Sequence, residues 1–320
     1  MSGAYRIGRI SEAEAEEVWG GSPQASVFSR PSVLSKLHEV VEWWAVFKGC
    51  EAQCSWPVPI DGLGQVVRVP FTYWVGPLWS SIASRHPAHR TLALTTSVYE
   101  LFISTFLEQY GVIQAELHPT LTDVRVFDWW NYHEPSLPRF RIRPRYSAEV
   151  ELLGPGEPPE AHFRELRRRE IRKFATRKDD FEPSGEVGWE EVSRLYLETL
   201  ADESMDMSSL QAKIRSLIGL IEEGHGWVQA QRFRSDGSLA CVILLLCDTG
   251  QANMVLNVAD RRVRSSGVMA DAVLSSMVEA WDRGLTRFDF NGANSPRRGD
   301  DKHSYGSRPV LFFELSFPSS

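Results

Sequence analysis

The stretch of sequence that decides the fold runs from Trp227 to Phe290. It begins with three apolar runs separated by two turn sequences: WVQAQRF (227–233), SDG (235–237), LACVILLL (239–246), DTG (248–250) and ANMVLNV (252–258). Short apolar runs bounded by Asp, Gly and Ser predict antiparallel strands joined by tight turns. A basic loop, RRVRSSG (261–267), leads into an expected helix over 268–282, and a further strand is expected over 285–290. This order of elements predicts a mixed α/β sheet covered by helices.

The first half of the chain shows a weaker version of the same order. A long helix is expected from His89 to Tyr110, Gly111 ends it, and a strand is expected over 112–117. The helix and strand on either side of Gly284 have the same arrangement, so a duplicated fold and two unrelated halves both stay open. The other expected elements are helices over 12–19, 31–41, 160–178, 189–200 and 208–223, strands over 43–50, 65–70, 147–153 and 310–317, and loops over 118–138 and 297–306.

The domain boundary is expected between residues 139 and 160, where the sequence changes character. The stretch RFRIRPRY (139–146) alternates arginine with Phe, Ile, Pro and Tyr, and GPGEPP (154–159) is a rigid break. We therefore expect an α/β (α+β) chain of two domains, 1–145 and 146–320. The last strand is expected either to stay in the second domain or to return to the first.

Composition sets limits on the class of protein. The 320 residues are 42% hydrophobic and 11% aromatic, which excludes disorder as the main state. The net charge of −7 excludes a protein that coats nucleic acid by bulk charge. No run of about 18 apolar residues predicts a membrane span, and the N-terminal sequence lacks the apolar core of a secretion signal, so the expected location is the cytoplasm. The four cysteines form no CxxC pair, so we expect reduced thiols and no metal site.

Two basic segments have residues suited to binding an anion. At the expected start of the helix over 268–282, backbone N–H groups and the helix dipole favour a phosphate, with Arg264, Ser266 and Gly267 beside it. An ordinary strand-to-helix turn is the alternative interpretation. The helix over 160–178 carries Arg168 and Arg172 among several other arginines, and it is either a solvated face or a track for a polyphosphate.

A third candidate segment follows the strand over 285–290. The sequence FDFNGANSP (288–296) ends a strand in a polar turn, which is a usual place for ligands in α/β sheets. RRGDDKHSYG (297–306) then brings two acids, three cations, a histidine and a tyrosine into ten residues. An ordinary solvated loop has a similar composition, so this pattern alone does not decide between the two interpretations.

Five motifs in order resemble those of a known family. FDFNG (288–292) followed by KHSYG (302–306) is similar to the DFxG … FKxxFG ending of the FemAB-like branch of the GNAT acyltransferase superfamily. The other matching pieces lie upstream: YWVGP (73–77), DVRVFDW (123–129), PRYSAEVEL (144–152) and REIRKFA (169–175). The resemblance therefore touches nearly the whole chain.

The resemblance implies two tandem GNAT-like domains, each a mixed sheet flanked by helices, with a substrate channel between them. It implies an acyltransferase that moves an aminoacyl group from charged tRNA, its co-substrate, to an amine of a peptidoglycan precursor or a small natural product, with no tightly bound cofactor. An acyl-CoA-dependent N-acyltransferase is the alternative, and a non-catalytic binding protein with this fold is a second one. The oligomeric state stays open.

These expectations give roles to individual residues. Acyl transfer to an amine needs a proton acceptor, a stabilised oxyanion and a proton for the leaving atom. We expect Lys302 to supply a cation near the carbonyl or the donor phosphate, Asp289 to accept the amine proton, with Asp300 as its alternative, and Tyr305 to be a donor. The expected substrate-binding residues are Tyr73, Trp74, Arg145, Asn291 and His303. The expected donor-binding residues are Arg264, Ser266, Gly267, Arg168 and Arg172.

Departures from the family pattern affect the choice of donor. Asp301 stands where the motif has an aromatic residue before the lysine, and it supports the non-catalytic alternative. Met269 stands where the GNAT pyrophosphate loop has a small residue, and its side chain would crowd the close approach of a phosphate. Met269 therefore favours charged tRNA as the donor, whereas Arg264 and Gly267 favour acyl-CoA.

Overall fold

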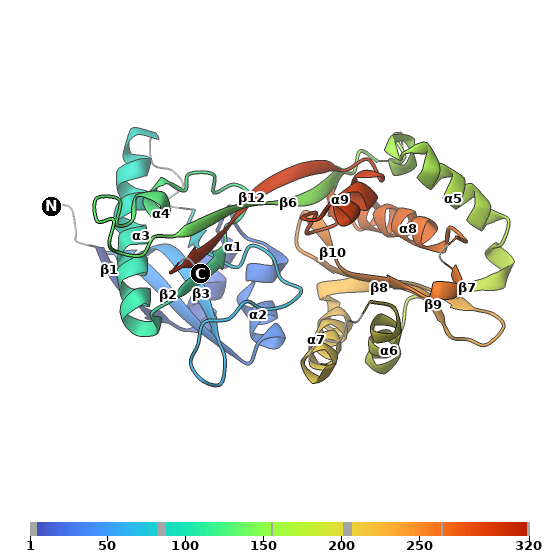
Figure 1. Ribbon diagram of the computed structural model, residues 1–320, viewed down its shortest axis with the longest axis horizontal. Helices are drawn as coiled ribbons and strands as arrows, with labels where there is room; N and C mark the ends of the chain where they lie inside the picture. The colour runs from blue at the N-terminus through green and yellow to red at the C-terminus, as the bar shows by residue number, and fades with distance from the viewer. Residues whose placement is uncertain (1–4, 82–87, 155, 201–206, 264, 319–320) are drawn as a thin grey trace. The chain divides into compact units, whose positions relative to one another are not determined.

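The structure is a computed structural model that describes residues 5–81, 88–154, 156–200, 207–263 and 265–318. The chain divides into two compact units (Figure 1). Unit 1 comprises Met1–Arg145 with Leu311–Ser320, and unit 2 comprises Tyr146–Val310. Two long strands, β6 (Arg141–Glu151) and β12 (Arg308–Phe317), contribute residues to both units.

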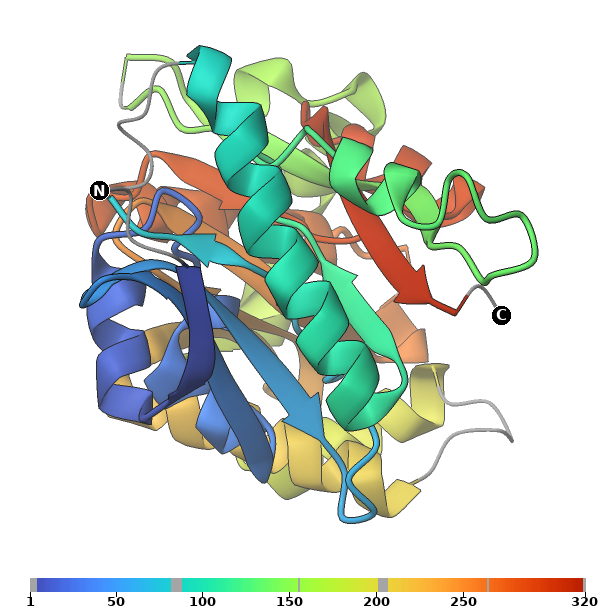
Figure 2. The same ribbon diagram turned by 90° about the vertical axis from the view of Figure 1, so that its left-hand side faces the viewer.

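Unit 1 contains a four-stranded sheet between helices. Its strands, in spatial order, are β1 (Tyr5–Ile10), β2 (Val40–Lys48), β3 (Glu51–Ile60) and β4 (Leu78–Trp79). The long helix α3 (Ala88–Tyr110) lies across one face of this sheet, and α1 (Glu12–Gly20) and α2 (Pro31–Leu37) lie on the other (Figure 2). Trp56 forms the centre of the core, because its ring contacts Phe102, Phe106 and Phe127 at centroid distances of 5.4–6.3 Å.

A second sheet has the strand order β5-β12-β6-β11-β10-β9-β8-β7. In unit 1, β5 (Ile113–Glu116) pairs antiparallel with β12, and α4 (Arg125–Trp129) follows β5 in sequence. The register places Leu315 opposite Ala115, both in the apolar core, and Glu314 opposite Glu116. Side chains of a strand alternate between faces. The two glutamates therefore lie on the face opposite to this core.

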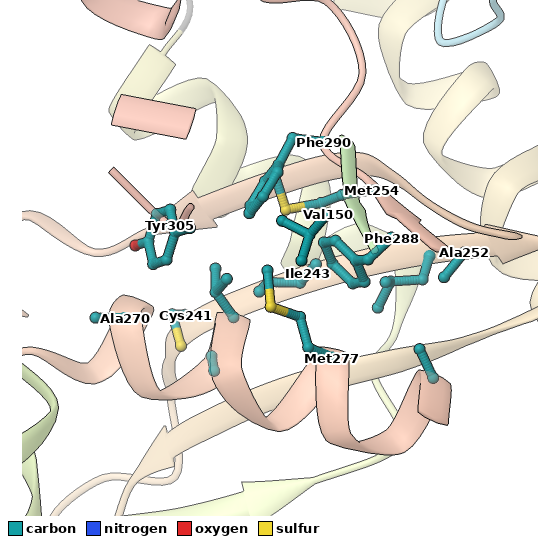
Figure 3. Close-up of a cluster of buried hydrophobic side chains, with 14 of the residues drawn as sticks. Val150, Cys241, Ile243, Ala252, Met254, Ala270, Met277, Phe288, Phe290 and Tyr305 are labelled. Atoms are coloured by element: carbon teal, nitrogen blue, oxygen red, sulfur yellow. The ribbon is translucent and has the colours of Figure 1, made fainter. Parts of the chain in front are cut away.

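Unit 2 contains the meander expected from the sequence. Its strands are β7 (Phe181–Ser184), β8 (Gly226–Phe233), β9 (Leu239–Cys247), β10 (Gln251–Ala259) and β11 (Arg287–Asp289). In Figure 1, α5 (Glu165–Ala175) and α8 (Val268–Asp282) lie on one side of the sheet, and α6 (Trp189–Leu200) and α7 (Met207–Leu220) lie on the other. The core between sheet and α8 includes Ile243, Met277, Phe288, Phe290 and Tyr305 (Figure 3).

The structure corrects several expected elements. The segment 65–70 is not a strand; Val66 makes only an isolated bridge to Ile60. The strand β3 was not expected, and its sequence contains Pro57 and Pro59. Since β4 pairs only with Cys54 and Ser55, the proline-containing part of β3 has one strand partner, which an edge position permits.

The expected loop over 297–306 is also wrong, because most of it is a helix. The helix α9 (Pro296–His303) begins at Ser295, whose side chain accepts a hydrogen bond from the Arg298 N–H. A serine followed by proline is a common helix start, so the sequence held a signal for this helix. None of the described helices is long and apolar enough to cross a membrane.

Candidate functional site

The most buried charged group among the expected site residues is Asp289, at the end of β11. Its side chain is fully buried. The Ser147 hydroxyl donates to Asp289 Oδ2 at 2.8 Å, and the Asn291 backbone N–H donates to Oδ1 at 2.6 Å. Burial raises the pKa of Asp289 to about 7 against these two hydrogen bonds, which lower it. The carboxyl group is therefore able to change its protonation state near neutral pH.

Lys302, on α9, is held beneath the turn that follows Asp289. Its Nζ donates to the backbone carbonyl oxygens of Phe290, Asn291 and Gly292 at 2.7, 2.7 and 2.8 Å. Burial lowers the pKa of Lys302 to about 8, but only the ammonium form has the three protons that three carbonyls accept. Lys302 is therefore charged at neutral pH, and its protons are directed at the turn.

Three other expected residues surround this turn. The Tyr305 ring is buried and stacks on Phe290 at a centroid distance of 5.4 Å, and burial raises the pKa of its hydroxyl. His303 Nδ1 lies 2.9 Å from Ser307 Oγ. Asn291 donates from Nδ2 to a strand carbonyl at 3.1 Å, and its buried Oδ1 has no hydrogen-bond partner in the described part of the chain.

The start of α8 is closed by the backbone of α5. Gly267 has a φ of +84°, and a Cβ added there would lie 2.0 Å from the Glu170 carbonyl oxygen. The buried Ser266 hydroxyl donates to the Val263 carbonyl oxygen and accepts from the Val268 N–H, so its hydrogen bonds are local. Gly267 thus permits the close packing of α5 against α8. Arg264 lies outside the described residues.

The arginines of α5 lie on an exposed face and share one acid. Glu165 pairs with Arg168 at 3.1 Å and with Arg172 at 2.6 Å. The side chains of Arg168 and Arg172 are 42% and 64% exposed, so the helix presents positive charge to solvent. On another part of the same helix, Arg167 pairs with Asp301 of α9, which gives Asp301 a structural partner.

The expected residues of unit 1 lie around a different feature. Trp74 is buried with a φ of +57°, and its backbone N–H donates to Glu116 Oε2 at 3.3 Å. The Tyr73 ring contacts Phe28 at a centroid distance of 5.6 Å. Arg145 Nε lies 3.5 Å from Glu314 Oε2. These contacts place Trp74 and Arg145 at the glutamate pair of β5 and β12, whereas the Tyr73 ring packs on Phe28.

Beside these residues, unit 1 contains a cavity of about 350 Å³. Its charged lining consists of Arg68, Arg141, Arg143, Arg145, Glu116 and Glu314. Of these, the sequence predicted only Arg145 as a site residue. The alternation of arginine over 139–146 was a signal for Arg141 and Arg143 as site residues, because residues two apart on a strand share a face with Arg145. Arg68 and the two glutamates had no signal of this kind.

The structure therefore brings the expected residues together in separate groups. Asp289, Asn291, Lys302, His303 and Tyr305 belong to one turn and helix of unit 2. Ser266 and Gly267 lie at the start of α8, the two α5 arginines lie on an exposed face, and Tyr73, Trp74 and Arg145 lie in unit 1. Among the described residues, no group of three or more His, Cys, Asp or Glu side chains is placed to hold a metal ion.

Comparisons with known proteins identify the fold. No protein-family model matches the sequence, and no curated protein is significantly similar to it. The structure is similar to that of FemX, with a TM-score of 0.66, 11% identity and 96% of each chain covered. It is also similar to a tandem GNAT protein from the clavulanic acid biosynthesis pathway, solved without AcCoA, with a TM-score of 0.56, 12% identity and 98% of each chain covered.

A third similar structure is the C-terminal domain of a putative lysylphosphatidylglycerol synthetase from Agrobacterium fabrum. The TM-score is 0.53 and the identity 12%, over 96% of this chain and 92% of that one. These similarities confirm the expected fold class: the chain has a FemAB-like fold of two tandem GNAT-like domains. Identities this low establish the fold and leave the activity to be argued from the site.

Proposed function

We propose that the chain is an acyltransferase that moves an aminoacyl group from charged tRNA to an amine of a peptidoglycan precursor or a small natural product. Two observations support acyl transfer: the FemAB-like motifs in the sequence, and the similarity to FemX over 96% of both chains. The putative lysylphosphatidylglycerol synthetase has the same fold, and its name specifies a lysyl group joined to a phospholipid.

The observation that carries the choice of donor is the contact between Gly267 and Glu170. A bound pyrophosphate needs exposed backbone N–H groups at a helix start. Here the Glu170 carbonyl oxygen lies 2.0 Å from the position that a Cβ on Gly267 would take. A carbonyl oxygen carries a partial negative charge and repels an anion brought close to it. The packing of α5 on α8 therefore favours a donor other than acyl-CoA.

The exposed face of α5 is the proposed contact with tRNA. Arg168 and Arg172 project from this helix, and among the described residues their ion pairs are both with Glu165, so a phosphate backbone meets an excess of positive charge there. Phosphate contacts of this kind release counterions from the nucleic acid, so binding weakens steeply as salt rises.

The proposed chemistry uses the turn after β11. The neutral amine attacks the ester carbonyl carbon of the aminoacyl-tRNA, and the bond from that carbon to the tRNA ribose oxygen breaks. Asp289 is the proposed proton acceptor, because a group with a pKa of about 7 is suited to this exchange at neutral pH. Tyr305 keeps its proton, since burial raises the pKa of its hydroxyl, and it is the proposed donor. Lys302 is the proposed cation, and it holds the turn that carries these groups.

An acyl-CoA-dependent N-acyltransferase is the second candidate, on a specific observation. The parallel pairing of β10 with β11 ends at Asn253 and Asp289, whereas β10 continues to Ala259. Within the described part of the chain, no strand pairs with β10 beyond Asn253 on that edge, and such an edge can bind an extended ligand by backbone hydrogen bonds.

The experiment titrates the purified protein in a calorimeter with coenzyme A, and then with charged tRNA over a salt series. The proposal predicts no detectable binding of coenzyme A and salt-dependent binding of tRNA, with transfer of a labelled amino acid to an amine. The double variant Arg168→Gln with Arg172→Gln should weaken tRNA binding and lower its salt slope by about 2. Arg125→Gln, an exposed residue of unit 1, is the control.

Binding of coenzyme A at about micromolar strength would overturn the choice of donor in favour of acyl-CoA. Binding of neither donor by the folded protein would favour the non-catalytic alternative.

A further inference from the structure

The cavity of unit 1 takes its charged lining from three neighbouring strands and one loop. Arg141, Arg143 and Arg145 alternate along β6, so their side chains share one face of that strand. Glu314 on β12 lies directly opposite Glu116 on β5. Since β12 lies between β5 and β6 in the sheet, the glutamate pair of β5 and β12 lies beside the arginines of β6 on one polar surface.

The charges of this lining do not balance. The lining includes four arginines and two glutamates, and no other charged residue contributes to it. The difference leaves an excess of two positive charges, in a chain whose net charge is −7. A concave surface of one sign concentrates ligands of the opposite sign. The excess therefore favours an anionic ligand.

The arginines are shared around one carboxylate at long distances. Glu314 lies 3.4 Å from Arg68, 3.4 Å from Arg143 and 3.5 Å from Arg145. Charge-assisted hydrogen bonds between guanidinium and carboxylate are about 2.7–2.9 Å long. Moreover, Arg145 Nε is buried and has no hydrogen-bond partner within the described residues. Arg143 and Arg145 therefore keep hydrogen-bonding capacity for a further anion, whereas Arg68 also makes a close ion pair with Glu116.

Glu116 does not supply the missing negative charge. It is buried, and it lies across the strand pair from a second carboxylate, Glu314. Burial raises the pKa of Glu116, with Glu314 adding to the effect and Arg68 opposing it. Like charges opposite each other on neighbouring strands destabilise the pair, so Arg68, which contacts both, is needed to hold them together.

The remaining lining gives the cavity an apolar side. Val67, Val69 and Val75, from the loop segment, supply it. A volume of about 350 Å³ with apolar walls and a few converging polar groups is typical of a site for a small organic molecule. A bare inorganic ion would leave the apolar side without contacts.

We propose that this cavity binds a small organic phosphate, in which a dianionic phosphate group meets Arg68, Arg143 and Arg145 and a ring or alkyl portion contacts the valine side. The phosphate replaces Glu314 as the main partner of these three arginines. The inference rests on the cavity alone, and it stands independently of the acyl donor and of the transferase activity.

The test is a calorimetric titration of the full chain with phenyl phosphate at pH 8, where this probe carries two charges. We expect one equivalent to bind, with an affinity that falls between about 50 and 200 mM salt. Benzyl alcohol, which has a similar ring without the charge, should not bind. Arg143→Gln should weaken binding by about tenfold, because it removes one charge-assisted partner. Arg125→Gln is the matched control, because this arginine of the same unit is similarly exposed and pairs with Asp123 outside the cavity.

Each outcome decides the proposal. No saturable binding by a protein whose circular dichroism shows it to be folded would overturn it. Equal affinity of the wild type and Arg143→Gln would also overturn it, because the probe would then bind elsewhere. If Arg143→Gln fails to fold, Arg145→Gln replaces it and carries the same expectation. Loss of binding in Arg125→Gln would likewise contradict the assignment to this cavity.

Discussion

The two polar regions of the molecule use the same chemical groups in opposite ways. At the turn of unit 2, one lysine donates to three carbonyl oxygens at 2.7–2.8 Å, and Asp289 receives two hydrogen bonds of its own. In the cavity of unit 1, three arginines approach one glutamate at 3.4–3.5 Å. The first region satisfies its two buried charged groups internally, whereas the second holds Arg143 and Arg145 in long ion pairs with Glu314.

The two regions distinguish a charge that holds the fold together from a charge that is available to bind a ligand. Burying an ion is costly unless hydrogen bonds replace its hydration, so Lys302 must keep all three of its contacts. Arg143 is 44% exposed, so water compensates for its imperfect ion pair with Glu314. We expect an arginine of this second kind to exchange one anionic partner for another without loss of the fold.

The largest expected effect comes from removing the buried cation. Lys302→Met leaves three carbonyl oxygens without a donor and Asp289 without its nearby positive charge, and it should lower the free energy of unfolding by about 3–5 kcal/mol. Arg143→Met, in the cavity, should change it by less than about 1 kcal/mol. Urea denaturation of both variants checks the comparison. Equal losses would mean that the two regions do not differ in the way described.

The next effect is a pH dependence that belongs to the turn alone. The folded protein holds the Asp289 proton up to a pKa of about 7, whereas the unfolded chain releases it near the usual value of 3.8. Between these values the folded state binds more protons, so stability falls as pH rises from about 4 to 7, by roughly 4 kcal/mol from this group. Asp289→Asn should flatten that part of the stability profile. A profile with an unchanged slope would show that Asp289 is ionised in the folded protein.

A smaller effect tests the closed start of α8. Gly267→Ala places a Cβ 2.0 Å from the Glu170 carbonyl oxygen at a φ of +84°. Gly284→Ala meets a similar φ of +82° with nothing within 4 Å. Gly284→Ala, the control, should lower the free energy of unfolding by about 1 kcal/mol through backbone strain. Gly267→Ala should lower it by about 1–3 kcal/mol more, because of the clash. Thermal or urea denaturation gives both values, and similar losses would mean that α5 moves easily from this position.

The smallest expected effect is on the affinity of the cavity for its ligand. Glu314→Gln removes the carboxylate that three arginines share and raises the positive excess of the lining by one charge. Phenyl phosphate should then bind roughly a few-fold more tightly, and the free energy of unfolding should change little. Titration of this variant against wild type measures the change. Weaker binding would instead show that Glu314 orients the arginines and does not compete with the ligand.

Much of the fold follows from local pattern. The strands β8, β9 and β10 and the helix α8 match their expected ranges closely, because apolar runs between Asp-Gly and Thr-Gly turns leave few alternatives. The strand β3 escaped prediction because only its position near the edge of a sheet makes Pro57 and Pro59 acceptable. The helix α9 escaped because its charged composition hides the start signal at Ser295 and Pro296.

The candidate site divides in the same way. The residues of the turn could be grouped from the sequence because they lie close together along the chain: Asp289, Asn291, Lys302 and Tyr305. The sequence also contains the alternation that puts arginines on one face of β6. Only the tertiary structure decided that Lys302 holds three carbonyls, that Glu170 closes the approach to Gly267, and that Arg68 and Glu314 meet. The last two residues are 246 positions apart, and periodicity cannot specify which distant strand or loop supplies a partner.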